Sequence, residues 1–298
     1  MWFKNLQIFR LPDGWEMTPA GLEEALAKHP LAACTGLQTQ SQGWTSPRDN
    51  DQLVYSFEKH MLVALGIDQK ILPASVVNDA AAEKAKQMEA ERGFKPGRKM
   101  LRQIKDEVTV SLLPRAFSRR RIVKAWIDPT AGWLIVDSSS GTVAEELVEQ
   151  LRNTLGGSFA VTRLDPERSS VAAMTEWVTD GRAPGNFEIH DECELCTTDQ
   201  ERASVRYLRH SLEGDDIRRH IAAGKVVVRL GLLWNERLSF LMDDKLQLKK
   251  FKFVDIDEVA EESQTEDPDE QFDLDFALMT GELNKLLDEL GRALGEGA

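Results

Sequence analysis

The most restrictive feature of this sequence is the short distance between successive apolar segments. Leu53 to Phe57 and Met61 to Ile67 have the composition of two β-strands, and only residues 58–60 separate them. Neighbouring parallel strands need a crossover of about a dozen residues or more, whereas antiparallel strands can be joined by a tight turn. The pair is therefore predicted to be antiparallel, which excludes the doubly wound parallel sheet of many nucleotide-binding enzymes.

Closely spaced strands recur along the chain, with single helices between them. Further strands are predicted at 3–11, 122–127, 133–136, 159–164, 226–234, 237–242 and 246–253, and helices at 18–28, 75–92, 98–113, 142–155, 171–178, 215–223 and beyond 276. Residues 31–51, rich in Gly, Ser, Thr and Gln, are predicted to be mostly loop. The fold class is predicted to be α+β, with antiparallel sheets and flanking helices. The β-α-β-β order of both halves suggests duplicated modules, although no residue-level repeat establishes this.

Prolines and glycines divide the chain into three parts. Pro73 and Pro114 bound a helical stretch that Gly93 interrupts, which predicts a helical basic arm. The predicted organisation is a first α+β module at 1–72 and 114–165, the arm at 73–113, and a second α+β module at 166–298. The second module includes an acidic stretch, Asp255 to Asp275, predicted to be a linker, and a C-terminal amphipathic helix.

Charge is segregated along the chain. The formal net charge is −13, and residues 253–298, with 15 acids and 2 bases, account for all of it. Residues 92–124, by contrast, contain 11 bases and only 2 acids. Because clustering like charges causes self-repulsion, such a patch favours a polyanionic partner, although an ordinary solvated face is the alternative interpretation of each cluster.

Two further basic clusters lie in the second half, at 202–229 and 245–252. Few aromatic residues accompany the bases, and no helix-turn-helix, zinc-finger or RRM motif is present, so we expect contacts with phosphates and little base readout. The candidate phosphate contacts taken from the three clusters are Lys95, Arg98, Lys99, Arg102, Arg115, Arg119, Arg120, Arg121, Lys124, Arg206, Lys249 and Lys250.

Motifs for enzymatic chemistry are weak. His190-Asp191-Glu192-Cys193-Glu194-Leu195-Cys196 combines His-x-Glu with Cys-x-x-Cys, but zinc deaminases carry these fragments on separate elements, so no metal site is predicted. Phosphate-binding glycine loops, a nucleophile elbow and a His-Glu-x-x-His motif are absent, and no cofactor is predicted. A metal-dependent nuclease with dispersed carboxylates remains the alternative function, and a protein-interaction module that recruits through the acidic tail is a third.

Phe117 lies among arginines directly after a helix-stopping proline. Burial statistics favour a buried anchor for the loop, and the alternative is a plug that enters a pocket of a partner. No apolar run is long enough to span a membrane, and three cysteines cannot form a disulfide framework, so a cytoplasmic, reducing location is predicted.

Several blocks resemble the RdgC family of recombination-associated proteins. They are Trp2-Phe3-Lys4-Asn5-Leu6, Lys70-Ile71-Leu72-Pro73, Lys105-Asp106-Glu107-Val108, Ser111-Leu112-Leu113-Pro114-Arg115-Ala116-Phe117-Ser118-Arg119, Trp126-Ile127-Asp128, Thr175-Glu176-Trp177-Val178, Ala223-Gly224-Lys225-Val226-Val227 and Leu278-Met279-Thr280-Gly281-Glu282-Leu283. The blocks extend over nearly the whole chain, and the one from 111 to 119 is the most specific.

This resemblance implies a DNA-binding protein without enzymatic activity that forms a ring-shaped homodimer around duplex DNA and restrains RecA recombinase. It implies a nucleoid-associated location, and leaves open single-stranded DNA as a ligand and direct contact with RecA. By the same resemblance, Phe117 inserts into a pocket of the second subunit, and Arg209 and His210 match positions that line the hole.

Overall fold

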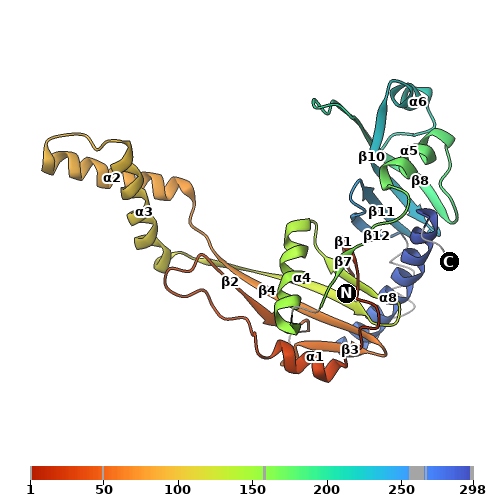
Figure 1. Cartoon of the computed structure of the whole chain (residues 1–298), viewed down its shortest axis with the longest axis horizontal. Helices are drawn as coiled ribbons and strands as arrows, with labels where there is room; N and C mark the ends of the chain where they lie inside the picture. The colour runs from red at the N-terminus through yellow and green to blue at the C-terminus, as the bar shows by residue number, and fades with distance from the viewer. Residues whose placement is uncertain (1, 49, 157–158, 255–264, 266, 296–298) are drawn as a thin grey trace.

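The structure is a computed structural model that describes residues 2–48, 50–156, 159–254, 265 and 267–295, and it has an α+β fold with one 12-stranded antiparallel sheet (Figure 1). The strands are β1 (Leu6–Arg10), β2 (Gln40–Thr45), β3 (Val54–Phe57), β4 (His60–Lys70), β5 (Ser118–Asp128), β6 (Trp133–Asp137), β7 (Thr162–Arg163), β8 (Phe187–Thr197), β9 (Ser204–Leu208), β10 (Lys225–Trp234), β11 (Leu238–Asp243) and β12 (Leu248–Phe253). The helices are α1 (Pro19–Leu26), α2 (Ala74–Arg92), α3 (Arg98–Leu112), the 3₁₀ helix η1 (Leu113–Arg115), α4 (Gly141–Leu155), α5 (Ser170–Asp180), α6 (Asp215–Ala222) and α8 (Pro268–Ala293).

The predicted antiparallel pair is confirmed. β3 pairs with β4 in a hairpin whose innermost pair is Phe57 with His60, and β4 then pairs with β5 along ten residues from Met61 to Lys70. The strand order is β2-β4-β5-β6-β1-β12-β11-β10-β8-β9. We call β1 to β7 the first half-sheet and β8 to β12 the second half-sheet. The two join where β1 pairs with β12.

Three strands, β2, β8 and β9, were not predicted from the sequence. β2 falls within 31–51 and was missed because its polar residues lack strand composition, yet Trp44 is buried and β2 pairs with β4. The close approach of the chain at Gly43, where an added Cβ would lie 2.5 Å from the Pro30 oxygen, requires glycine. β8 and β9 were missed because charged residues on their open face break the apolar pattern.

Two hydrophobic cores lie on opposite faces of the sheet. The larger core runs under both half-sheets and contains Leu6, Trp126, Trp234 and the buried side chains of α5, α6 and α8. The second core, which contains Trp44 and Val123, lies under α1 and α4 on the other face of the first half-sheet. Trp133, Trp177 and Trp234 are all buried in the larger core.

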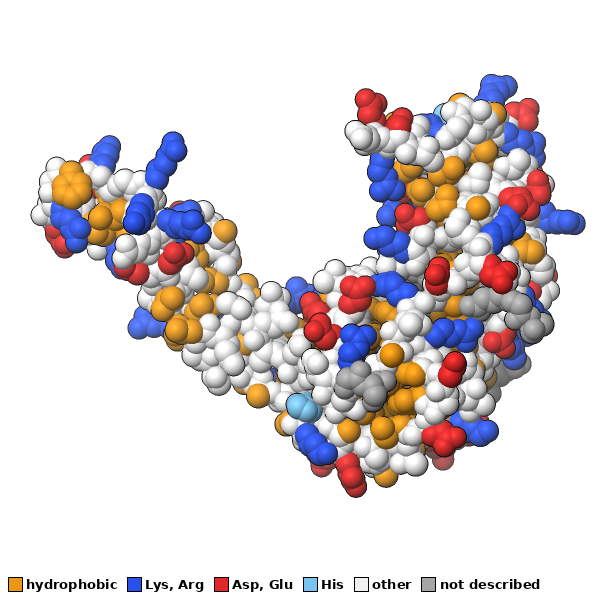
Figure 2. Space-filling model, in the orientation of Figure 1, with side chains coloured by type: hydrophobic (Ala, Val, Ile, Leu, Met, Phe, Trp, Pro, Cys, Tyr) orange, Lys and Arg blue, Asp and Glu red, His pale blue; other side chains and the backbone are white. Residues whose placement is uncertain are grey.

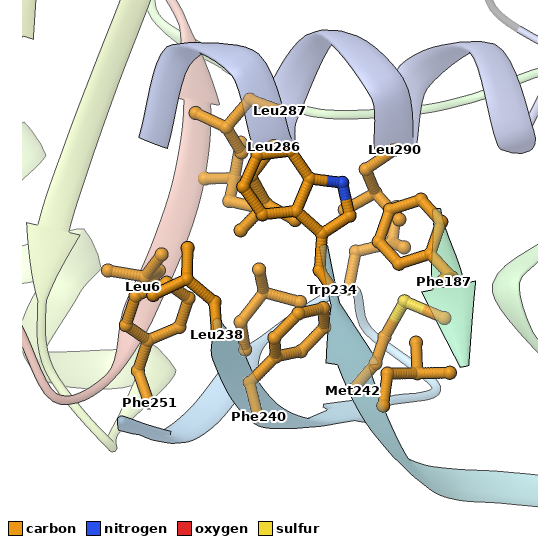
Figure 3. Close-up of a cluster of buried hydrophobic side chains, with 14 of the residues drawn as sticks. Leu6, Phe187, Trp234, Leu238, Phe240, Met242, Phe251, Leu286, Leu287 and Leu290 are labelled. Atoms are coloured by element: carbon orange, nitrogen blue, oxygen red, sulfur yellow. The ribbon is translucent and has the colours of Figure 1, made fainter. Parts of the chain in front are cut away.

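Helix α8 connects the half-sheets through an apolar stripe. Leu286, Leu287 and Leu290 pack on Trp234 and Phe187 of the second half-sheet (Figure 3). Side-chain hydrogen bonds fix both ends of the helix. Near its start, Asp273 accepts from Tyr55 at 2.7 Å and from Arg48 at 2.9 Å, and near its end Glu289 accepts from the Trp234 indole at 2.8 Å.

Part of the acidic stretch 255–275, which was predicted to be a linker, is helical. Residues 268–275 belong to α8, and residues 255–264 and 266 lie outside the described residues. The helix begins here because the Asp267 side chain caps it, Pro268 suits its first turn, and Asp269 and Glu270 interact favourably with the helix dipole.

The predicted arm consists of α2 and α3, which project from the far ends of β4 and β5 (Figure 1). Gly93 ends α2 in the left-handed conformation, with φ at 76°. Ala81, Ile104 and Val108 form a small core between the two helices. Its separation from the larger cores means that the arm is held mainly by its own packing and by the strands that carry it.

The packing of α8 predicts a large stability effect for one leucine and a small effect for another. Leu286 is fully buried, whereas Leu278 on the same helix is 39% exposed. Leu286→Ala should lower the free energy of unfolding by about 2–5 kcal/mol, because it leaves a cavity in the larger core. Leu278→Ala should cost well under half as much. Urea denaturation followed by circular dichroism measures both, and equal losses would contradict the packing described.

Candidate nucleic-acid interface

The arm and the second half-sheet stand on either side of a wide hollow (Figure 2). Lys and Arg side chains appear along the upper edge of the arm and along the edge of the second half-sheet that borders the hollow. Helix α4 rises from the first half-sheet between them (Figure 1). Basic segments distant in the sequence thus border one concave side of the molecule.

Four candidate bases of the arm are exposed and have no acidic partner among the described residues, whereas Lys84 of α2 pairs with Glu107 of α3 at 2.7 Å. Lys95 lies in the loop between α2 and α3, and Arg98, Lys99 and Arg102 lie in the first two turns of α3. None of these four side chains forms an ion pair with another residue in the described part of the chain. Arg115, in η1, is exposed in the same way. These side chains are therefore available to an external anion.

The arginines of β5 do not form one surface. Side chains alternate between the two faces of a strand, and Val123 packs in the second core while Trp126 packs in the larger core. Arg119 and Arg121 therefore lie on the face that carries α4, and Arg120 lies on the opposite face. Lys124 shares the face of Arg120 and is half-buried. Burial raises the pKa of Asp137, and the charge of Lys124 acts against that shift.

On the second half-sheet the candidate bases are ion-paired. Arg206 donates to Glu192 at 2.7 Å and Lys250 approaches the same carboxylate to 2.6 Å. Lys249 lies 2.9 Å from Asp243. The pKa of Glu192 is below its usual value. Burial acts to raise this pKa, but the hydrogen bonds from Lys250 and Arg206 lower it by more. Unlike the arm, this surface presents bases whose charge is already balanced.

Strand register arranges these charges in a ladder. Arg206 lies opposite Glu194, Glu194 lies opposite Arg229, and Arg229 lies opposite Asp243. Residues directly opposite each other in antiparallel strands share one face of the sheet. The larger core and its helices occupy the other face, where Cys193 and Leu195 point. We call the face that carries the ladder the charged face.

A groove of about 1120 Å³ separates the charged face from α4 and β7. The bases that line it are Arg163, Arg202, Arg229, Lys245 and Lys249, together with five carboxylates. Of these bases, only Lys249 was among the sequence candidates. Arg202, Arg229 and Lys245 belong to the basic clusters and could have been selected from them. Arg163 lies outside the clusters, and nothing in the sequence marks it as a candidate.

Arg209 and His210 lie apart from this groove, in the turn after β9. Arg209 is exposed and has φ at 52°, in the left-handed region. His210 Nδ1 lies 2.7 Å from the Ser211 oxygen, and the residue lines a separate pocket of about 430 Å³ together with His190. The residues that line this pocket and those that line the groove do not overlap.

Phe117 is not the buried anchor that burial statistics favoured, because 86% of its surface is exposed. Its backbone is nonetheless fixed, since the Ile71 amide donates to the Phe117 oxygen at 2.7 Å. Ile71, which makes this bond, and Ile122, which lies in β5 five residues after Phe117, are each 48% exposed. The root of the arm therefore presents apolar side chains that this chain does not cover.

The His190 to Cys196 segment lies within a single strand, β8. Cys193 points into the larger core, where burial raises the pKa of its thiol to about 12, and Cys196 points to the groove. The two sulfurs therefore do not converge. Among the residues that the structure describes, no three His, Cys, Asp or Glu side chains are grouped to hold a metal ion.

A search for membrane-spanning helices gives a negative result for the described part of the chain, where none combines the necessary length and apolar character.

Comparison with known proteins identifies the family. The model of the RdgC family, described as "Putative exonuclease, RdgC", matches residues 1–297. The recombination-associated protein RdgC of Dechloromonas aromatica is 45% identical over 299 residues, covering 99% of this chain and 98% of the relative. Those of Janthinobacterium sp. (strain Marseille) and Herminiimonas arsenicoxydans are 44% and 43% identical over 295 residues, with the same coverage. As the block resemblances predicted, the chain belongs to the RdgC family.

Proposed function

We propose that this protein binds DNA without sequence preference as a homodimer that encircles the duplex, and that it thereby restrains RecA-mediated recombination. The observation that carries the proposal is the placement of bases from the arm and from the second half-sheet around one hollow (Figure 2). Phosphates are the groups that exposed Lys and Arg side chains bind on DNA, and such contacts are independent of sequence.

The ring is proposed because a single chain is open on one side. Two copies joined through their arms, and again through their second half-sheets, would close the hollow into a channel. Phe117, exposed at the root of the arm, would supply an apolar contact between the copies. The relatives are named recombination-associated proteins, and a ring that occupies DNA would restrain RecA by excluding it. A nucleoid location follows from DNA binding.

The net charge of −13 does not oppose this proposal. Most of the acids that produce it lie in α8 and the segment before it, and α8 packs on the face of the sheet opposite the charged face. DNA would therefore meet the bases of the concave side first. The acids of α8, on the opposite face of the sheet, would be separated by the sheet from phosphates bound at the charged face.

Charge reversal on the arm tests the phosphate contacts. Arg98→Glu with Arg102→Glu should weaken binding equally for duplexes of unrelated sequence, and should flatten the slope of log affinity against log salt by about 2. Fluorescence anisotropy between 50 and 200 mM salt, with about 10³- to 10⁵-fold loss expected for the wild type, measures both effects. Lys285→Glu on α8 is the control, and losses that differ between sequences would indicate base readout instead.

Truncation of Phe117 tests the proposed dimer contact. Phe117→Ala should weaken the dimer by about 2 kcal/mol, roughly 30-fold in its dissociation constant, because apolar anchors dominate interfaces. Analytical ultracentrifugation over a range of concentrations measures the change. Phe94→Ala, at another exposed phenylalanine of the arm, is the matched control. A dimer that is unchanged by Phe117→Ala would show that the contact lies elsewhere.

The description of the family model favours a second candidate, a metal-dependent exonuclease. We propose that the protein is not an enzyme, and the matter is decided by incubating it with end-labelled linear duplex and Mg²⁺ or Mn²⁺. The expected result is no release of nucleotides. Release that co-purifies with the protein and disappears on carboxylate substitution would establish the exonuclease.

A further inference from the structure

One carboxylate on the charged face holds two of the candidate DNA contacts at once. Glu192 lies on β8, and its Oε1 accepts from Arg206 of β9 at 2.7 Å and from Lys250 of β12 at 2.9 Å. Its Oε2 lies 2.6 Å from the same Lys250 ammonium. The three residues come from separate strands, so the sheet itself brings them together.

The contacts balance the charge of both bases while leaving them exposed. The Glu192 side chain is 17% exposed, whereas those of Arg206 and Lys250 are 44% and 56% exposed. The carboxylate therefore lies beneath the two bases, which remain on the surface. A phosphate could approach both bases from the side of the hollow, but would meet the carboxylate charge behind them.

Neighbouring pairs extend the same pattern. Arg229 lies 2.9 Å from Glu194, and Lys249 lies 2.9 Å from Asp243. The four bases Arg206, Arg229, Lys249 and Lys250 thus face three carboxylates across the charged face. On the arm, by contrast, Lys95, Arg98, Lys99 and Arg102 have no such partner among the described residues.

We propose that Glu192 masks Arg206 and Lys250 in the free protein and so sets the affinity of the charged face for DNA. The proposal rests on the proposed function, because it concerns how the same hollow binds phosphates. The arm then supplies the stronger, unmasked contacts. The charged face supplies contacts that form only when phosphates compete with the carboxylate.

The physical basis is competition for the same hydrogen-bond donors. Arg and Lys donate charge-assisted hydrogen bonds both to carboxylates and to phosphates. A phosphate gains little net energy if it must first displace a carboxylate, and the displaced charge remains nearby to repel it. Removing the carboxylate charge frees both donors, and each additional phosphate contact steepens the salt slope by about 0.9.

Glu192→Gln tests the proposal, because the amide keeps the shape of the side chain and removes its charge. At about 0.1 M salt, affinity for a duplex longer than the hollow should rise by roughly tenfold, and the salt slope should steepen by about 1 to 2. Glu282→Gln is the matched control. Glu282 is 16% exposed and is paired with Lys285 at 2.8 Å on α8, away from the charged face, so its substitution should leave DNA affinity unchanged.

A second comparison starts from the protein with Glu192 intact. In the otherwise unaltered protein, Arg206→Gln should reduce affinity less than twofold, whereas Arg102→Gln on the arm should reduce it by up to about tenfold. In the Glu192→Gln background, Arg206→Gln should become as costly as Arg102→Gln. Thermal unfolding of each variant establishes that it is folded.

The outcomes separate the two proposals. Unchanged or weakened binding by folded Glu192→Gln, or equal losses for Arg206→Gln and Arg102→Gln in the unaltered protein, would overturn the masking role and leave DNA binding intact. A wild-type protein that binds no duplex at low salt would overturn both.

Discussion

The structure depends on the burial of one helical stripe against a continuous sheet. The stripe consists of side chains that are each at most 1% exposed in the larger core, namely Phe276, Met279, Leu283, Leu286, Leu287 and Leu290. This core includes Leu6 and Trp126 of the first half-sheet as well as Trp234 and Phe240 of the second. Because the helix crosses the join between β1 and β12, its burial fixes the angle between the half-sheets. The hollow on the opposite side takes its shape from that angle.

The sequence predicts those parts of the fold in which local pattern and tertiary packing agree. The spacing of Leu53–Phe57 and Met61–Ile67 established an antiparallel hairpin, and the heptad-like leucines after Phe276 established a terminal helix. β2, β8 and β9 were not predicted because polar residues on their exposed faces interrupt the apolar pattern. These segments are strands because they pair with neighbouring strands. Long-range pairing of this kind leaves no local signal.

The sequence locates the clusters of bases but not their electrostatic state. The clusters fall on the arm, on β5 and on the second half-sheet, and whether each base is paired with an acid depends on the fold. That Arg206 and Lys250 share Glu192, 14 and 58 residues away, follows from strand register alone. Arg119, Arg120 and Arg121 likewise do not share one face. They lie in β5, where successive side chains point to opposite faces of the sheet, and the sequence predicted no strand at these residues.

The connection of the arm to the body bears on how far each copy of a closed assembly would reach. β4 and β5 lead to α2 and α3, and β2 pairs with β4 from Ala64 to Gln69, so three paired strands support the arm close to its root. The arm also keeps its own small core of Ala81, Ile104 and Val108. In the proposed ring, three hydrogen-bonded strands would act as a stiff bracket that holds each arm at a set distance from its own body.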